Sequence, residues 1–437
     1  MPDDDRYRGE GPIVVTLESA VRRRQLAILV AIAISHITAG ALFGTSVAYY
    51  IGLEGSPFLV SLAFAVFSLG LLVFAPVWGA IADITGRRKA VVVGTSLGTV
   101  LAVAPLTAAN PVWLEIASRG LFAVFVAGFQ STMLTIVSES GGDHGRGRAI
   151  GFYSSAESVG DIVGQLLVGY LLGVLFPNQL YLVIVVVGIV STTLVLLITD
   201  PTPEPDEPAT VARFRDEFRR RFAPRSVRNG FPDGHGLGWL YVGLFLRNMT
   251  QKGVSAVLPV YLTQTVGLTE FLMGVVLAVS PTIRTVAMYG FGRLSDAIGR
   301  KHLIVLGIGG AAGQALVLVG ATIPTALPAR VGLSALAFVV HAVTFSALTI
   351  GTIAFISDVA PLDRESELIG LRSTARGAGG VVGPLAVGAL ATVTDYPTSF
   401  VVISVVSIVA TVLVATRVTE SYEGSGGLEA ASGEPAE

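Results

Sequence analysis

Charged side chains interrupt several long apolar stretches of this 437-residue chain. Glu157 and Asp161 are four residues apart, so they share one face of a helix. Arg372 and Arg376 have the same spacing in a second stretch, and Arg284 lies in a third. Carboxylates in such surroundings can bind a proton and arginines can bind an anion. No cluster of acids and histidines has catalytic or metal-ligand spacing, so we expect no catalytic residues, no metal site and no enzymatic activity.

One further stretch, residues 238–264, carries two cations that point in different directions. Arg247 and Lys252 are five residues apart, which places them about 140° apart around a helix. They cannot both face one point. We favour Arg247 together with Gln251 facing the interior, and Asn248 with Lys252 is the alternative pair.

The composition is that of an integral membrane protein. Hydrophobic residues make up 52% of the chain, charged residues only 14%, and the mean hydropathy is +0.71. Soluble domains contain about 25% charged residues. The chain has no cysteine, which excludes a disulfide framework and a thiolate metal site.

Twelve stretches are long enough to cross a membrane, which requires about 20 apolar residues. They lie at residues 25–51, 57–81, 90–109, 112–137, 149–175, 179–198, 238–264, 270–294, 302–323, 330–356, 367–392 and 397–417. Basic residues occur in the turns after the second, fourth and eighth stretches, but not after the first, third, fifth and seventh. By the positive-inside rule, the basic turns and both termini are cytoplasmic.

A charged, glycine-containing turn occurs twice, at equivalent places in the two halves of the chain. Its repeated residues are Gly79, Asp83, Gly86 and Arg87, which become Gly292, Asp296, Gly299 and Arg300 after 213 positions. Glu139, which ends the fourth stretch, matches Asp358, which ends the tenth. The chain therefore consists of two related six-helix halves.

The sequences GAIADITGRRK (79–89) and GRLSDAIGRK (292–301) resemble the signature loops of the Major Facilitator Superfamily. The resemblance covers almost the whole chain and implies an all-α integral membrane fold, with twelve transmembrane helices in two pseudo-symmetric six-helix bundles. The expected organisation is a cytoplasmic segment (1–24), a first bundle (25–198), a cytoplasmic linker (199–237), a second bundle (238–417) and a disordered cytoplasmic tail (418–437). The pattern is closest to the proton-coupled drug exporters of that superfamily.

The linker has a pattern of its own. Val211, Phe214, Phe218 and Phe222 recur every three or four residues, with arginines between them. This spacing predicts an amphipathic helix on the anionic inner leaflet of the membrane. A solvated basic linker is the alternative.

The resemblance assigns the repeated turns to a cytoplasmic gate. In the superfamily the aspartate of the turn caps a helix of the opposite half, so Asp83 is expected to face the start of the eleventh helix and Asp296 that of the fifth. The expected ion pairs join Arg87 to Glu139 and Arg300 to Asp358.

The resemblance also places the fifth and eighth helices side by side, so Arg284 is expected to reach Glu157 and Asp161. Two hypotheses stay open for this contact. It is either a static interface or a switch in which protonation of one carboxylate releases the arginine. The remaining candidates for the substrate and ion pathway are Arg119, Arg247, Gln251, Arg372 and Arg376.

Together these features predict a secondary transporter that works by alternating access and exports a small organic amphiphile or drug, with H⁺ as the coupling ion. The excess of membrane-embedded cations over acids indicates the alternative, uptake or exchange of a small organic or inorganic anion. A non-transporting membrane sensor is a remote alternative. We expect no cofactor, no nucleic-acid partner, and a monomer in the plasma membrane whose partners are its small-molecule substrate and the lipid bilayer.

Overall fold

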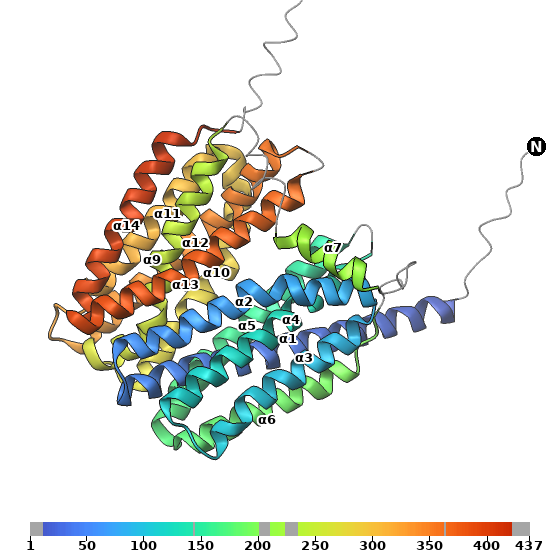
Figure 1. Cartoon of the computed structure of the whole chain (residues 1–437), viewed down its shortest axis with the longest axis horizontal. Helices are drawn as coiled ribbons and strands as arrows, with labels where there is room; N and C mark the ends of the chain where they lie inside the picture. Colours follow the sequence, from blue (N-terminus) through green and yellow to red (C-terminus); the bar gives the residue numbers. More distant parts are fainter. Residues whose placement is uncertain (1–11, 143–144, 201–209, 223–234, 362–363, 422–437) are drawn as a thin grey trace, which may run out of the picture.

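The computed structural model describes residues 12–142, 145–200, 210–222, 235–361 and 364–421, without the side chains of residues 12–23, 289, 292, 293, 296 and 297. Within these ranges every regular element is a helix (Figure 1). The predicted all-α fold is therefore confirmed. The predicted terminal segments lie mostly outside these ranges, because the description begins at residue 12 and ends at residue 421.

Six long helices form the first bundle. They are α1 (Pro12–Glu54), α2 (Pro57–Thr85), α3 (Arg88–Val103), α4 (Val112–Ser140), α5 (Arg146–Val174) and α6 (Pro177–Leu196), and a 3-10 turn, η1 (Ala104–Thr107), extends α3. Proline begins α2 and α6, where its fixed φ suits the first helical turn. Gly86 ends α2 with a φ of 64°, a left-handed conformation that glycine adopts without steric cost.

The linker and the second bundle continue the pattern. The linker contains α7 (Val211–Phe222). The second bundle contains α9 (Leu237–Val260), a π-helical turn η2 (Tyr261–Thr265), α10 (Glu270–Ile298), α11 (Arg300–Gly320), α12 (Leu327–Val359), α13 (Glu365–Val393) and α14 (Tyr396–Arg417). In Figure 1 the two bundles lie side by side and α7 lies beside α2 at the gap between them.

Eleven of the described helices are long and apolar enough to cross a membrane. The twelfth predicted span corresponds to α9, which packs among α11, α13 and α14 like the other long helices. It falls outside the eleven because Arg247, Asn248, Gln251 and Lys252 interrupt its apolar sequence. A polar helix in the middle of a bundle points to a functional interior, because membrane-embedded polar residues otherwise face lipid at a high cost.

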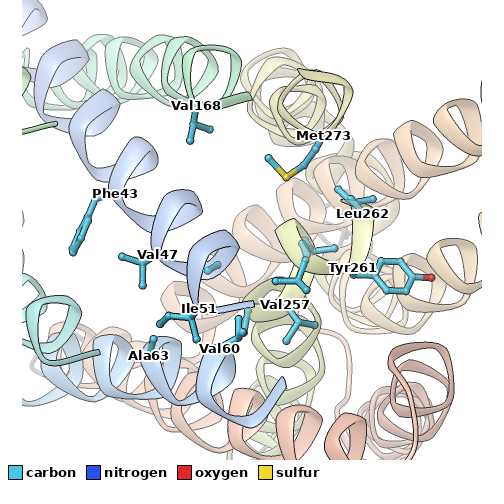
Figure 2. Close-up of a cluster of buried hydrophobic side chains, with 14 of the residues drawn as sticks. Phe43, Val47, Ile51, Val60, Ala63, Val168, Val257, Tyr261, Leu262 and Met273 are labelled. Carbon is cyan, nitrogen blue, oxygen red and sulfur yellow. The ribbon is translucent and has the colours of Figure 1, made fainter. Parts of the chain in front are cut away.

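The two ends of the molecule differ. We call the end with the turns after α2, α4 and α10 the basic end. At the opposite end one hydrophobic core contains residues of both bundles, with Ile51 and Val60 beside Val257 and Leu262 (Figure 2). At the basic end each bundle has a core of its own. The bundles are therefore joined at the opposite end and separate at the basic end.

Polar contacts reinforce the joined end. Gln264 donates to the Gly52 carbonyl at 3.0 Å, and the Tyr49 hydroxyl donates to the Glu270 carboxylate at 2.8 Å. Gly52 also gives α1 room to approach α9, since a Cβ there would overlap the side chain of Val260.

Candidate functional site

An acid and an arginine meet between the two bundles, where α5 packs along α10. Arg284 Nη2 lies 3.9 Å from Asp161 Oδ2, and both side chains are about one-third exposed. Asp161 also accepts a hydrogen bond from Gln165 at 3.3 Å. Glu157, one turn away, is within electrostatic range of the same arginine. The structure thus brings together the three residues that the sequence analysis placed in one contact.

Three arginines surround one phenyl ring in the second bundle. Arg247 of α9, Arg284 of α10 and Arg376 of α13 place their guanidinium carbons 5.9, 5.5 and 5.6 Å from the centre of the Phe345 ring of α12. His341, one turn earlier on α12, has its ring 5.8 Å from that of Phe345. We call Arg247, Arg284, Arg376 and Phe345 the Phe345 cluster.

Two of these arginines have buried nitrogen atoms and no acidic partner among the described residues. Arg247 is 1% exposed, and its Nε and Nη2 atoms have no hydrogen-bond partner among the described residues. Its Nη1 donates only to the neutral Asn248 side chain at 3.4 Å. Arg376 Nε is likewise buried without a partner in the described chain. A cation in such surroundings lacks the compensation that buried charges usually have.

The structure distributes the polar residues of α9 differently from the favoured interpretation. Gln251 is buried and donates to Gln314 of α11 at 2.8 Å, so it does not face open space. Lys252 is exposed instead, beside Gly380 of α13. The difference arises because Gln251 has a neutral side chain that another buried amide, Gln314, satisfies by a hydrogen bond.

Two other predicted cations lie outside the Phe345 cluster. Arg119 of α4 is enclosed by four phenyl rings, at 4.0–5.9 Å from their centres, belonging to Phe43, Phe64, Phe67 and Phe122. Its Nε and Nη1 atoms are buried without hydrogen-bond partners in the described chain. Arg372, one turn before Arg376, donates to the Thr352 hydroxyl at 2.8 Å.

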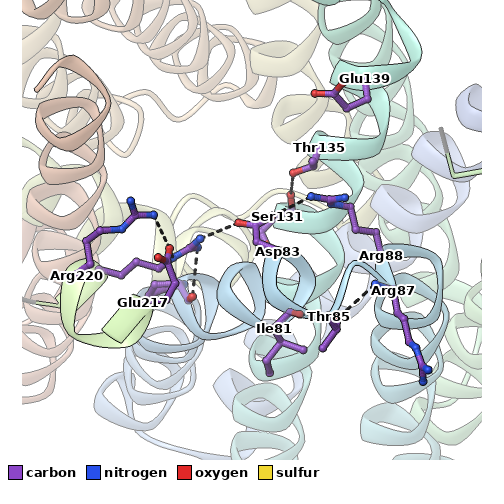
Figure 3. Close-up of polar contacts among 12 residues, drawn as sticks. Ile81, Asp83, Thr85, Arg87, Arg88, Ser131, Thr135, Glu139, Glu217 and Arg220 are labelled. Carbon is purple, nitrogen blue, oxygen red and sulfur yellow. Dashed lines mark hydrogen bonds and ion pairs between the residues drawn. The ribbon is translucent and has the colours of Figure 1, made fainter. Parts of the chain in front are cut away.

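The first copy of the repeated turn contacts the linker helix. Arg221 of α7 donates to the Asp83 carboxylate at 2.8 Å, and Arg88 donates to its other oxygen at 3.3 Å. Figure 3 shows Asp83 between Arg88 and the part of α7 that carries Glu217 and Arg220. Among the described residues, the start of α13, which the resemblance assigned to Asp83, is not its partner in this conformation. The reason is that the bundles are separate at this end.

The α7 contact is built from one acid and two arginines. Glu217 accepts hydrogen bonds from Arg220 at 2.8 Å and Arg221 at 2.7 Å. Partial burial raises the pKa of Glu217, but these two hydrogen bonds outweigh it and hold the pKa below its ordinary value. Gly79 leaves room for Arg221, since a Cβ there would lie 2.5 Å from Nη1. Beside this contact, α7 and the end of α2 line a cavity of about 430 Å³.

Glu139 has a different partner from the one expected. Arg146, at the start of α5, lies 3.4 Å from Glu139. Figure 3 shows the Arg87 side chain directed away from Glu139, so the expected ion pair is absent from the described residues in this conformation. Arg88, the next residue, is the one that turns toward Asp83.

The second copy of the turn contacts the segment after α14. Arg300 lies 3.2 Å from Asp358, as the resemblance implies. Glu420 accepts hydrogen bonds from the backbone N–H groups of Arg300 at 2.9 Å and Lys301 at 3.0 Å, which places a carboxylate at the N-terminus of α11. Gly299 has a φ of 88° at this turn. Gly292 and Asp296 are among the residues whose side chains are not described.

Comparison with known proteins decides the family. The model of the Major Facilitator Superfamily matches residues 28–348 and 240–436. The chain belongs to the Major Facilitator Superfamily. This confirms the resemblance drawn from the repeated turns, and makes the chain a multi-pass membrane protein of a transporter family.

Relatives within the superfamily are distant in sequence. The Multi-drug resistance efflux pump PmrA homolog of Lactococcus lactis is 24% identical over 250 residues, which cover 56% of this chain and 59% of that protein. The Multi-drug resistance efflux pump PmrA of Streptococcus pneumoniae is 21% identical over 344 residues, 78% of this chain and 81% of the relative. The chain therefore aligns with less than two thirds of the first of these proteins.

Solved structures of the superfamily share the fold. The nucleoside transporter NupG has a TM-score of 0.71 at 12% identity, covering 89% of this chain and 98% of its own. The human organic anion transporter TETRAN has a TM-score of 0.61 at 16% identity, covering 90% of this chain and 99% of its own. At these identities the likeness extends to the fold alone.

Four residues of the candidate site were not predicted from the sequence: Phe345, Arg221, Glu420 and Arg88. Phe345 is an ordinary apolar residue in an apolar helix, and only its three cationic neighbours distinguish it. Arg221 and Glu420 act from outside the two bundles, in segments with no counterpart in the repeat. Arg88 had a signal, because the first turn reads GRRK where the second reads GRK, so two arginines competed for one role.

Proposed function

We propose that this protein exports a small organic amphiphile by alternating access, coupled to the movement of protons. The observation that carries the proposal is the difference between the two ends, one joined by a shared core and the other divided into two cores. A pathway that is closed at one end and separated at the other is one of the two states that alternating access requires. The direction of transport follows the relatives whose names describe efflux pumps.

The basic end is placed on the cytoplasmic side of the plasma membrane. Excess arginine and lysine in short loops mark the cytoplasmic face of membrane proteins. Both termini then lie in the cytoplasm, and the conformation is open inward. We assign the functional unit to a monomer because each bundle has its own core and the two share a further one within a single chain.

Proton coupling is assigned to the contact between Asp161 and Arg284. At 3.9 Å the attraction depends on the charge of the carboxylate. Protonation of Asp161 removes that attraction and frees Arg284 at an interface along which the bundles must move. Glu157 supplies a second carboxylate within electrostatic range of the same arginine.

The gate at the cytoplasmic end is assigned to both copies of the repeated turn. In the inward-open state the first copy is held by α7, through Arg221, and the second by the segment after α14, through Glu420. Each turn is therefore engaged by the segment that follows its own bundle. Closure of this end requires Asp83 to leave Arg221 and meet the opposite bundle.

Transport into liposomes tests the proposed function. Purified protein is reconstituted with a pH-sensitive dye inside the vesicles and challenged with organic anions, organic cations and uncharged amphiphiles. We expect protons to move only when one class of amphiphile is present. We expect Asp161→Asn to reduce this movement. Proton movement with none of these compounds, from protein that is folded and inserted, would refute the proposal.

A further inference from the structure

We propose that the cargo is an organic anion with an apolar body, and that the Phe345 cluster binds its acidic group. The inference rests on the proposed export function, because it names the class of amphiphile that is moved. It extends that function to a defined site in the second bundle.

The cluster gathers groups that can bind a planar acid. Three helices direct guanidinium groups at one ring, each between 5.5 and 5.9 Å from its centre. The guanidinium is a planar fork that matches a carboxylate or sulfonate with two parallel hydrogen bonds. A phenyl ring has no oxygen or nitrogen acceptor, and Nε and Nη2 of Arg247 and Nε of Arg376 have no other acceptor among the described residues, so these donors remain for a ligand oxygen.

Unpaired donors within the cluster point to an anion. Arg247 is 1% exposed, yet two of its nitrogen atoms have no partner in the described part of the chain. Buried donors are nearly always hydrogen-bonded in proteins, so an unsatisfied one calls for a specific explanation. An oxyanion that receives bonds from Arg247 and Arg376 supplies both the missing acceptors and the missing negative charge.

The local charge balance supports the same ligand. Lys252 is within electrostatic range of Arg247, Arg284 and Arg376, and Arg247 is within range of Arg376. The acids of the neighbouring α5, Glu157 and Asp161, act on Arg284. Arg247, Arg376 and Lys252 form no ion pair within the described ranges, so the interior retains positive charge.

The apolar body of the ligand has a complementary surface on the first bundle. Arg119 is within electrostatic range of Lys252, which places its surroundings near the cluster. Those surroundings include Phe64 and Phe67 of α2, which are only partly buried. Partly exposed aromatic surface therefore lies near Lys252, and such surface fits an aromatic or aliphatic body better than an inorganic ion.

Equilibrium binding to the purified full-length protein tests the proposal with matched probes. Radiolabelled naphthoate is the anion, the naphthylmethylammonium ion is the cation with a similar body, and sulfate is an inorganic anion. We expect naphthoate to bind, the cation to bind at least about tenfold more weakly, and excess sulfate to leave most of the naphthoate bound. Arg247→Gln removes charge-assisted hydrogen bonds and is expected to weaken naphthoate binding about tenfold to a hundredfold.

Three variants separate a binding role from a folding role. Arg247→Lys keeps the charge and is expected to recover part of the binding lost in Arg247→Gln. Phe345→Leu is expected to weaken naphthoate binding without creating affinity for the cation. Arg417→Gln is the matched control, since Arg417 also lies over an aromatic ring, that of Trp239 at 5.5 Å, but outside the cluster. Melting temperatures of all variants are measured in parallel.

The outcomes distinguish this inference from the proposed function. Tighter binding of the cation, equal binding of both probes, or naphthoate binding that Arg247→Gln leaves unchanged would overturn the inference, even if cationic amphiphiles are exported. Naphthoate binding that depends on the cluster supports the inference, even if liposomes show no proton-coupled movement and the export proposal fails.

Discussion

Arg221 donates a hydrogen bond to Asp83 at 2.8 Å although 138 positions separate them in the chain. The contact joins the linker helix to the turn that the superfamily uses as a gate. It occupies the aspartate while the bundles are apart at this end. Under the gate proposal, α7 competes with the opposite bundle for the same carboxylate, and the linker takes part in gating.

Arg221→Ala is expected to shift the conformational balance away from the inward-open state. The ion pair is partly exposed, so it contributes at most about 1 kcal/mol, which corresponds to a population change of about twofold to fivefold. Since the chain has no cysteine, Ser155→Cys and Thr374→Cys introduce one spin label in each bundle. Pulsed electron paramagnetic resonance then reports the distance between the bundles near the basic end.

The control for that change is Arg219→Ala, which removes the same charge from an exposed position of α7. It is expected to leave the distance distribution as it is in the parent protein. A shift of equal size in both variants would assign the effect to the net charge of the linker and contradict a specific contact with Asp83.

Docking of α7 is expected to be insensitive to pH between about pH 5.5 and pH 8. Burial raises the pKa of Glu217, but the hydrogen bonds and charges of Arg220 and Arg221 together lower it below its ordinary value in the folded state. The contribution of Glu217 is therefore present above the ordinary carboxyl pKa. It is lost only as the pH falls through the lowered value. The spin-label distances in parent and Glu217→Gln protein, measured across this range, check the expectation. A transition near neutral pH in the parent that Glu217→Gln removes would contradict it.

Asp161→Asn is expected to flatten the pH dependence of transport and to slow transport about tenfold or more, equivalent to about 1.4 kcal/mol of lost coupling. The neutral amide cannot switch its attraction for Arg284. Glu157→Gln is expected to preserve part of the pH dependence, because Glu157 has no direct ion pair in the described chain. Glu54→Gln, at an exposed acid of the opposite end, is the control. An unchanged pH profile in Asp161→Asn would show that the contact is a static interface.

Gly383→Ala is expected to destabilise the second bundle by about 1–3 kcal/mol, the usual cost of overpacking. A Cβ at Gly383 would overlap the carbonyl oxygen of Met249, where α13 packs against α9. Gly370→Ala in the same helix is the control, since a Cβ there has no neighbour within 4 Å. Melting temperatures in detergent compare the two variants. Equal stability would contradict the packing assigned to α9 and α13.

The fold was predictable because membrane insertion imposes a strong pattern on a sequence. The features that predicted it can be read from short segments of the sequence. They are the apolar stretches of bilayer length, the basic turns such as that at Gly86, and the repeated aspartates. The composition of α9 alone did not identify it as a membrane span, since Arg247 and Lys252 reduce its hydropathy. The repeat of the two halves still required a helix there.

The site was predictable only in part, because the partner of a charged side chain changes with the conformation of the two bundles. The contact of Arg284 with Asp161 followed from the neighbouring helices of the superfamily. That of Arg300 with Asp358 followed from the superfamily's pairing of the turn arginine with an acid at a helix end. The partner of Asp83 did not, since the repeat describes the closed gate and the structure is open at that end. Phe345 was not predictable, because three arginines converge on it from three helices far apart in sequence.

Alternating access requires the two ends of the molecule to move reciprocally. Spin labels at Ser155→Cys and Thr374→Cys report the basic end, and labels at Leu53→Cys and Val393→Cys, both exposed, report the opposite end. The two distances are measured in liposomes with and without naphthoate, at acidic and neutral pH. We predict that conditions that shorten the first distance lengthen the second. Two distances that stay fixed under all conditions, or that change in the same direction, would contradict alternating access.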